Sequence, residues 1–202
     1  MIMYKQYYLE PERLSKLQQQ ISEIATAHGW HEQPKSPEHW CGLIMTEMAE
    51  AVEADRNNRR ANTKRMAEII EFQAKSDEGL SYDWYEKWYK LYYKEYVKGS
   101  IEEEFADVVI RILDMTQEIH GERINWIGDY PCGEVFHEEK SFIENAWCFV
   151  RRVLNWGTMN ISDCVSFMFD WAHHLDIDLW QHIEWKMKYN ELRPYKHGGK
   201  KY

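Results

Sequence analysis

The sequence has little proline and glycine, with five and ten of these residues among 202. Turn-dense all-β folds need them at many turns, so this scarcity, together with long stretches rich in Glu, Lys, Leu, Met and Ala, favours helices. No window approaches the ~18 apolar residues that span a membrane. The first residues also lack the apolar core of a signal peptide. We therefore expect a helical protein with neither a membrane anchor nor an export signal.

Cysteine pairs and zinc-type spacings are absent as well. The four cysteines, Cys41, Cys132, Cys148 and Cys164, form no CxxC motif and no Cys/His pattern typical of a metal site. Isolated cysteines of this kind are usually reduced and buried. The pattern predicts a cytoplasmic protein without disulfides.

Positive charge is in short supply, since 25 Lys and Arg stand against 34 Asp and Glu, a net charge of −9. Binding to DNA, RNA or an anionic membrane requires many phosphates to be neutralised at once. The balance therefore argues against a nucleic-acid polymer or a membrane as a partner. The exception is local, because residues 186–202 contain six Lys or Arg and one Glu.

What the sequence does contain is enough apolar surface for a core. Apolar residues make up 44% and aromatic residues 15%, with ten Trp. A chain of this length and composition is typical of one globular domain. We expect a single all-α domain over residues 1–202.

The periodicity of apolar residues predicts the helices. Capping signals mark two of them: Ser36 and Pro37 precede a helix to about residue 56, and Ser100 with Glu103 forms a capping-box pattern at the start of a helix over 100–120. Residues 57–99 are less regular, with a short helix and a stripe of aromatic residues every four positions, which is more often packing or a subunit contact than a ligand platform. The other predicted helices cover residues 10–28, 140–156, 160–174 and 177–193.

Two of these helices carry acids three residues apart, Glu47 with Glu50 and Glu104 with Asp107. Side chains at i and i+3 project from one helix face, with Cβ atoms ~5–6 Å apart. A lone ExxE more often marks a solvated face, but these pairs are embedded among apolar residues, where an unpaired charge is costly. Two such helices facing one another would form a cage of four carboxylates, which suits a hard cation such as Mg²⁺.

At this point the sequence resembles a known family. The stretch TEMAEAVEADR followed by EEEFADVVIRIL resembles the ExxE…ExxD signature of the all-α nucleoside triphosphate pyrophosphohydrolases, the MazG-like group that includes the dimeric dUTPases and dCTP pyrophosphatases. The terminal YNELRPYKHGGKKY is similar to the YNxxRPYxHGGKK-type tail of a MazG-like subgroup of phage and bacterial proteins. The 53 residues between Glu50 and Glu104 exceed the family's usual connection, so residues 57–99 are predicted to be an insertion.

The resemblance implies a helical bundle with two facing carboxylate-bearing helices and a helical insertion between them. It implies cleavage of a nucleoside triphosphate between the α and β phosphates, giving a monophosphate and pyrophosphate, with Mg²⁺ as cofactor and Mn²⁺ as a substitute. Carried over by motif, Glu47, Glu50, Glu104 and Asp107 would be the metal ligands and catalytic carboxylates. The family is generally oligomeric, which implies a homodimer.

The basic segment 186–202 is predicted to bind the substrate's phosphates, where cationic side chains help and carboxylates cannot. Without the resemblance, a frayed and solvated tail would be the more common outcome. Gly198 and Gly199 would let the chain turn sharply. The candidate phosphate ligands are Lys188, Asn190, Arg193, His197 and Lys200.

Other roles are less sharply indicated. His39 and Trp40 lie two turns before Glu47 and are candidates for a base pocket, although Trp40 at such a position is more often core. Glu53 and Glu103 fall close to the signature acids and are candidates for orienting or deprotonating water. The sequence does not distinguish the base or sugar of the substrate.

Two other functions fit the same residues. A non-catalytic nucleotide-binding or oligomerisation module would keep the fold without turnover. A carboxylate-bridged di-iron bundle also uses helical Glu residues, but such sites usually need ExxH motifs, and neither carboxylate helix has one.

Overall fold

The computed structural model describes residues 9–75, 82–121, 136–155, 161–199 and 201 of the chain, and every regular element among them is a helix. The prediction of an all-α fold is therefore confirmed. Cys132 and Lys200 lie outside the described residues. In chain order the helices are α1 (Pro11–Ala27), α2 (Pro37–Arg56), α3 (Thr63–Lys75), α4 (Tyr82–Tyr96), α5 (Ile101–His120), α6 (Phe142–Leu154), α7 (Ile161–His174), α8 (Leu179–Glu191) and the short turn α9 (Lys196–Gly199).

The capping residues define the ends of the two carboxylate helices. The Ser36 hydroxyl accepts a hydrogen bond from the His39 amide at 3.2 Å, and the Ser100 hydroxyl accepts one from the Glu103 amide at 3.2 Å. These bonds satisfy amides that would otherwise have no partner in the first turn. At its other end α5 stops at Gly121, whose φ of 66° is a left-handed value that glycine adopts readily.

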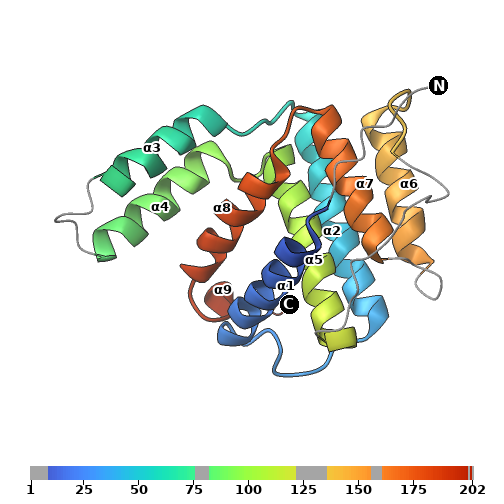
Figure 1. The fold of residues 1–202 in the computed structure, drawn as a ribbon, viewed down its shortest axis with the longest axis horizontal. Helices are drawn as coiled ribbons and strands as arrows, with labels where there is room; N and C mark the ends of the chain where they lie inside the picture. Colours follow the sequence, from blue (N-terminus) through green and yellow to red (C-terminus); the bar gives the residue numbers. More distant parts are fainter. Residues whose placement is uncertain (1–8, 76–81, 122–135, 156–160, 200, 202) are drawn as a thin grey trace.

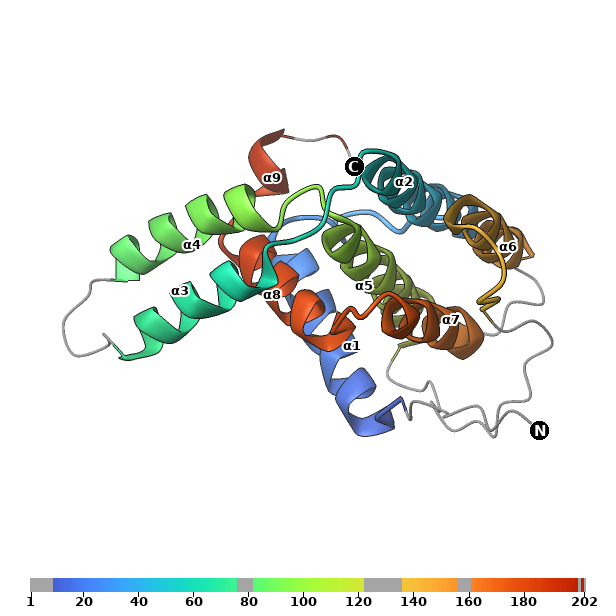
Figure 2. The same ribbon diagram turned by 90° about the horizontal axis from the view of Figure 1, so that it is seen from above.

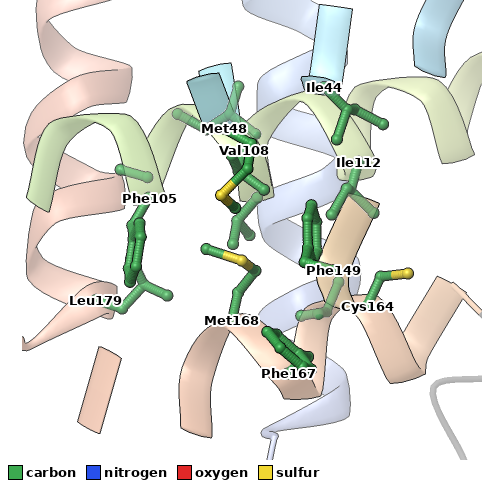
Figure 3. Close-up of a cluster of buried hydrophobic side chains, with 14 of the residues drawn as sticks. Ile44, Met48, Phe105, Val108, Ile112, Phe149, Cys164, Phe167, Met168 and Leu179 are labelled. Atoms are coloured by element: carbon green, nitrogen blue, oxygen red, sulfur yellow. The ribbon is translucent and has the colours of Figure 1, made fainter. Parts of the chain in front are cut away.

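Helix α5 is the centre of the bundle, and α1, α2, α7 and α8 all pack against it (Figure 1). Helix α6 lies on the outside, against α2 and α7. Figure 3 shows part of the core, where Met48 of α2, Phe105 and Val108 of α5, and Met168 of α7 come together. Because α5 is surrounded by other helices, most of its side chains are buried, including several charged ones.

The predicted insertion contains two helices that pack on each other and project from the bundle (Figures 1 and 2). We call α3 and α4 the hairpin. A second apolar cluster fixes it to α8, with Tyr93 stacked on Tyr189 at a ring-centroid distance of 4.4 Å. The Tyr89 hydroxyl also donates to the Trp185 carbonyl at 2.9 Å. The aromatic side chains of the hairpin are therefore largely packing residues.

Among the residues described, none of the helices combines the length and the apolar character that crossing a bilayer requires. The described cysteines, Cys41, Cys148 and Cys164, are buried, and no disulfide joins them. The burial of these three cysteines agrees with the expectation from their isolated positions in the sequence.

Candidate functional site

Three consecutive acids in the first turn of α5 are buried. Glu102, Glu103 and Glu104 are 3%, 2% and 5% exposed. Successive helical residues point about 100° apart, so the three carboxylates face different parts of the molecule. Their interaction partners therefore differ, and this difference distinguishes acids with a structural role from the candidate functional acid.

Glu102 and Glu103 are both neutralised by the protein. Glu102 accepts from the Arg60 guanidinium at 2.6 Å and from the Ala61 amide at 2.9 Å. Glu103 accepts from the Lys186 ammonium at 2.5 Å and also from the Gly99 amide. In contrast, the Glu104 carboxylate makes no hydrogen bond or ion pair within the described part of the chain.

Glu104 belongs instead to a cluster of three acids. One carboxylate oxygen each from Glu47 of α2, Glu104 and Asp107 of α5 lie within 4.8 Å of one another. The cluster forms because α2 packs along α5 and the i, i+3 pair on α5 faces Glu47. Glu50, the fourth predicted ligand, is exposed and lines the same cavity, but it is not one of the three clustered acids.

The electrostatics of this cluster are unfavourable without an added cation. Burial, together with Asp107 and Glu103, raises the pKa of Glu104 to about 9. Burial also raises the pKa of Asp107 to about 7, even though Lys186 opposes the change. An acid whose charged form is disfavoured to this extent is typical of a functional site, because burial without a partner otherwise costs stability.

Two cations hold the acids in place. The Lys186 ammonium is 2.5 Å from both Glu103 and Asp107, and the Arg111 Nε donates to Glu47 at 2.9 Å. Burial would lower the pKa of Lys186, but the two carboxylates outweigh it and raise that pKa above its usual value. Lys186 is thus a permanent positive charge inside the site.

These groups line one cavity of about 310 Å³ between α1, α2, α5 and α8. Six carboxyl side chains and four Lys or Arg side chains line it among the described residues, a formal excess of two negative charges when every carboxyl group is ionised. The acids are Glu47, Glu50, Glu103, Glu104, Asp107 and Asp114, and the cations are Lys98, Arg111, Lys186 and Arg193. The cavity therefore has both the charge deficit that a divalent cation would correct and cationic groups that can meet an anion.

The predicted phosphate ligands have different locations. Asn190, Arg193 and His197 line the cavity, whereas Lys188 lies outside its lining and pairs with Glu191 at 3.0 Å. Residues at i, i+4 and i+7 share a helix face, so Lys186, Asn190 and Arg193 point the same way and position 188 does not. Lys186 was not among the predicted ligands, because the choice between positions 186 and 188 depends on which face of α8 packs on α5.

The end of the chain packs on its own α1 and on the loop that follows it. The Arg193 carbonyl lies 2.8 Å from the His28 Nε2, and the Lys196 amide donates to the His28 carbonyl at 3.0 Å. The Lys196 ammonium also pairs with Glu32 at 2.6 Å. The loop itself is held to α5 by Lys35, whose amide and ammonium donate to the Glu118 carboxylate at 2.7 and 3.3 Å. The His31 Nε2 also lies 2.9 Å from an Asp114 oxygen.

The remaining candidates lie away from the cavity, except Glu103. His39 is exposed at the start of α2, and Trp40 is 1% exposed in the main core; neither lines the cavity. Glu53 is exposed and accepts from Arg56 at 2.9 Å. The structure thus brings Glu103 to the cavity wall and keeps these other three side chains outside it.

Comparison of the chain with protein-family models, curated proteins and solved structures finds no match. The family resemblance therefore stays a prediction. The function has to be inferred from the chemistry of the cavity.

Proposed function

We propose that this protein is a Mg²⁺-dependent, MazG-like nucleoside triphosphate pyrophosphohydrolase, which cleaves a (d)NTP to a (d)NMP and pyrophosphate. The observation that carries the proposal is the Glu47–Glu104–Asp107 cluster, whose three carboxylates lie within 4.8 Å of one another and in which Glu104 makes no ion pair with a described residue. The same cavity presents Lys186, Arg111 and Arg193. A site with acids on one side and fixed cations on the other suits a metal-bound polyphosphate.

The donor set fits the proposed metal. All three groups of the cluster are carboxylates, and oxygen donors are the ligands that Mg²⁺ and Mn²⁺ prefer. The cluster contains no histidine, in contrast to the usual ligand set of a di-iron bundle. Burial, followed by the neighbouring acids Asp107 and Glu103, raises the pKa of Glu104 to about 9, and a bound divalent cation would stabilise the ionised form of this carboxylate. Glu47, Glu104 and Asp107 would hold this ion, with Glu50 beside them.

When bound, Mg²⁺ would activate a water molecule and stabilise the charge that develops on the phosphates. The ion pairs of Lys186 with Asp107 and of Arg111 with Glu47 fix the orientation of two carboxylates before substrate arrives. Arg193 is the candidate phosphate contact, because it lines the cavity from the end of α8. Burial lowers the pKa of Arg193, but a guanidinium remains charged at neutral pH.

The proposed reaction forms a bond between a water oxygen and the α-phosphorus, and breaks the bond from that phosphorus to the oxygen that bridges the α and β phosphates. Pyrophosphate leaves with the electron pair. The proton of the water passes to a carboxylate, for which Glu50 is the candidate because it lines the cavity next to the cluster. The products are a monophosphate and pyrophosphate in equal amounts.

The test is a panel of normal and modified nucleoside triphosphates, incubated with the full chain and Mg²⁺, Mn²⁺ or EDTA. We expect equal amounts of monophosphate and pyrophosphate on ion-exchange chromatography, only when metal is present. Glu47→Gln should abolish turnover, while Lys188→Met, outside the cavity, should not. Release of single phosphates, or no turnover of any nucleotide, would contradict the proposal. Binding without turnover would favour the non-catalytic module.

Two further expectations belong to this proposal. We infer that the partners are a nucleotide substrate and a second copy of the chain, and that the protein acts in the cytoplasm. Light scattering coupled to size exclusion tests the homodimer, and a monomeric mass at micromolar concentration would contradict it.

A further inference from the structure

The cavity has two chemically different ends, and the register of two helices gives the distance between them. Lys186 of α8 contacts Asp107, while the backbone of Arg193, two residues past the end of α8, contacts His28 through its carbonyl. On α5, Asp114 is seven residues beyond Asp107 and contacts the loop after α1. Seven helical residues rise about 10 Å. The carboxylate cluster and the loop after α1 are therefore about 10 Å apart along the cavity.

The loop end of the cavity is aromatic. The indole of Trp30 and the imidazole of His197 both line it, with ring centroids 5.1 Å apart and ring planes at 75°. Two nearly perpendicular rings form a corner. A flat ring that stacks on one wall of this corner presents its edge to the other wall, which is a favourable arrangement for aromatic groups.

The backbone of the chain's end holds His197 in this corner. Residue 197 has φ 48° and Gly198 has φ 86°, both left-handed, so the chain turns sharply here. The imidazole lies 5.9 Å from the ring of His28, and the preceding amide donates to the His28 carbonyl. His197 therefore lies among rings at the loop end, and not beside Lys186 at the carboxylate end.

A buried amide lies between the two ends. Asn190 occupies the face of α8 between Lys186 and Arg193, and its buried Oδ1 has no hydrogen-bond partner among the residues described. A buried polar atom left unpaired is destabilising, and a ligand group that hydrogen-bonds to it removes that cost. An amide offers both donors and an acceptor, as the polar edge of a nucleobase does.

We propose that this end of the cavity is a nucleobase subsite, in which a planar heteroaromatic ring rests in the Trp30–His197 corner and the Asn190 amide contacts its polar edge. The proposal rests on the proposed function in one respect, that a nucleotide occupies the cavity. The sugar then spans the middle of the cavity and directs the phosphates toward Lys186 and the carboxylate cluster. His197, predicted from the sequence as a phosphate ligand, recognises the base instead.

Binding experiments test the subsite without requiring turnover. We would titrate the full chain with the five common nucleoside monophosphates and with ribose 5-phosphate, which has the phosphate but no base, by isothermal titration calorimetry. At least one monophosphate should bind about 10-fold or more tightly than ribose 5-phosphate. Base stacking of this kind is worth roughly 5-fold to 100-fold in affinity. Trp30→Leu and His197→Ala should each remove at least 5-fold of this preference, leaving ribose 5-phosphate binding unchanged.

Matched variants control for general effects. His39→Ala alters the exposed histidine of the alternative base pocket, and Trp147→Ala alters an indole that is 60% exposed on α6. Both should keep the preference, and Trp30→Phe, which retains a ring, should keep most of it. Thermal melting would show that each variant is folded.

Three outcomes would overturn the subsite: equal binding of monophosphates and ribose 5-phosphate, equal weakening of both ligands in Trp30→Leu and His197→Ala, or loss of the preference only in His39→Ala. Hydrolysis without any base preference would leave the proposed function standing. Base-dependent binding without hydrolysis would support the subsite and contradict the proposed hydrolysis, so the failures of the two proposals are distinguishable.

Discussion

Glu102 and Glu104 are two residues apart on α5 and are buried to nearly the same extent, 3% and 5% exposed, yet their surroundings are opposite. Glu102 faces the start of the insertion, where Arg60 and the Ala61 amide neutralise it. Glu104 faces α2, where its neighbours are other carboxylates. Burial of an acid therefore does not identify a functional site. The distinguishing feature of Glu104 is that its carboxylate makes no ion pair or hydrogen bond within the described residues and lies among other acids.

The largest effect expected from this contrast is on turnover. Glu104→Gln keeps the shape but removes one proposed metal ligand, which should lower kcat/KM at least about 1000-fold, since metal assistance is worth several kcal/mol. The same change should raise the melting temperature in EDTA, because the ionised carboxylate is disfavoured in the fold. Steady-state kinetics and calorimetry measure the two effects. Glu53→Gln, outside the cavity, is the control, and loss of activity in that variant as well would break the contrast.

The next largest effect concerns the cation between Glu103 and Asp107. Lys186→Met leaves Glu103 and Asp107 without the cation that they share, and breaking a buried ion pair in this way costs about 3–5 kcal/mol. We expect a lower melting temperature in EDTA that Mg²⁺ partly restores, by a larger shift than in the unaltered protein. Lys188→Met should behave like the unaltered protein. If Mg²⁺ raised the melting temperature of all three proteins equally, the Lys186 ammonium and the metal would not both neutralise the cluster.

The neutralised acid should affect stability alone. Glu102→Gln retains an acceptor for the Ala61 amide but removes the charge that pairs with Arg60, a loss of about 1–3 kcal/mol. Turnover per folded molecule should be unchanged. Arg60→Gln should cost less, since Arg60 is 46% exposed and the pair is partly solvated. Chemical denaturation gives the free energy of unfolding, and a matching fall in kcat would contradict the structural role of Glu102.

The smallest effect comes from a carboxylate remote from the cluster. Burial raises the pKa of Asp170 on α7 from 3.8 to about 6. Because the folded state disfavours the ionised form, the fold loses stability as pH rises from about 4 to about 6, and the loss is complete above that range. Asp170→Asn should therefore stabilise the protein by about 1–2 kcal/mol above pH 6, with little change below pH 4. Added Mg²⁺ should not stabilise the unaltered protein at Asp170, in contrast to the expected effect at Glu104. If Asp170→Asn raised the free energy of unfolding equally at all pH values, the ionisation of Asp170 would not be the cause.

The sequence predicts the parts of the structure that depend on local signals. The caps at Ser36 and Ser100, the apolar spacing of the helices and the i, i+3 acids require no knowledge of the rest of the chain. Two helices with buried acids also have few ways to satisfy them except by facing each other. The pairing of Glu47 with Glu104 and Asp107 follows from this requirement.

Contacts between distant segments carry no such signal. Nothing local distinguishes Lys186 from Lys188 until the face of α8 that packs on α5 is known. The Trp30–His197 corner joins residues 167 positions apart, through backbone bonds between the end of the chain and His28. The partner of Glu102 comes from the insertion, whose position the sequence leaves open.

Helix α8 connects the hairpin to the cavity, because it packs on the one and lines the other. Trp185 and Tyr189 pack into the cluster under the hairpin, and Lys186 and Asn190, each one residue further on, line the cavity. A helix moves as a stiff rod, so a rotation that separates Tyr189 from the hairpin also withdraws the ammonium from Asp107. No side chain of α3 or α4 lines the cavity within the described ranges. The hairpin nevertheless fixes the orientation of α8, and with it the position of the Lys186 ammonium in the cavity.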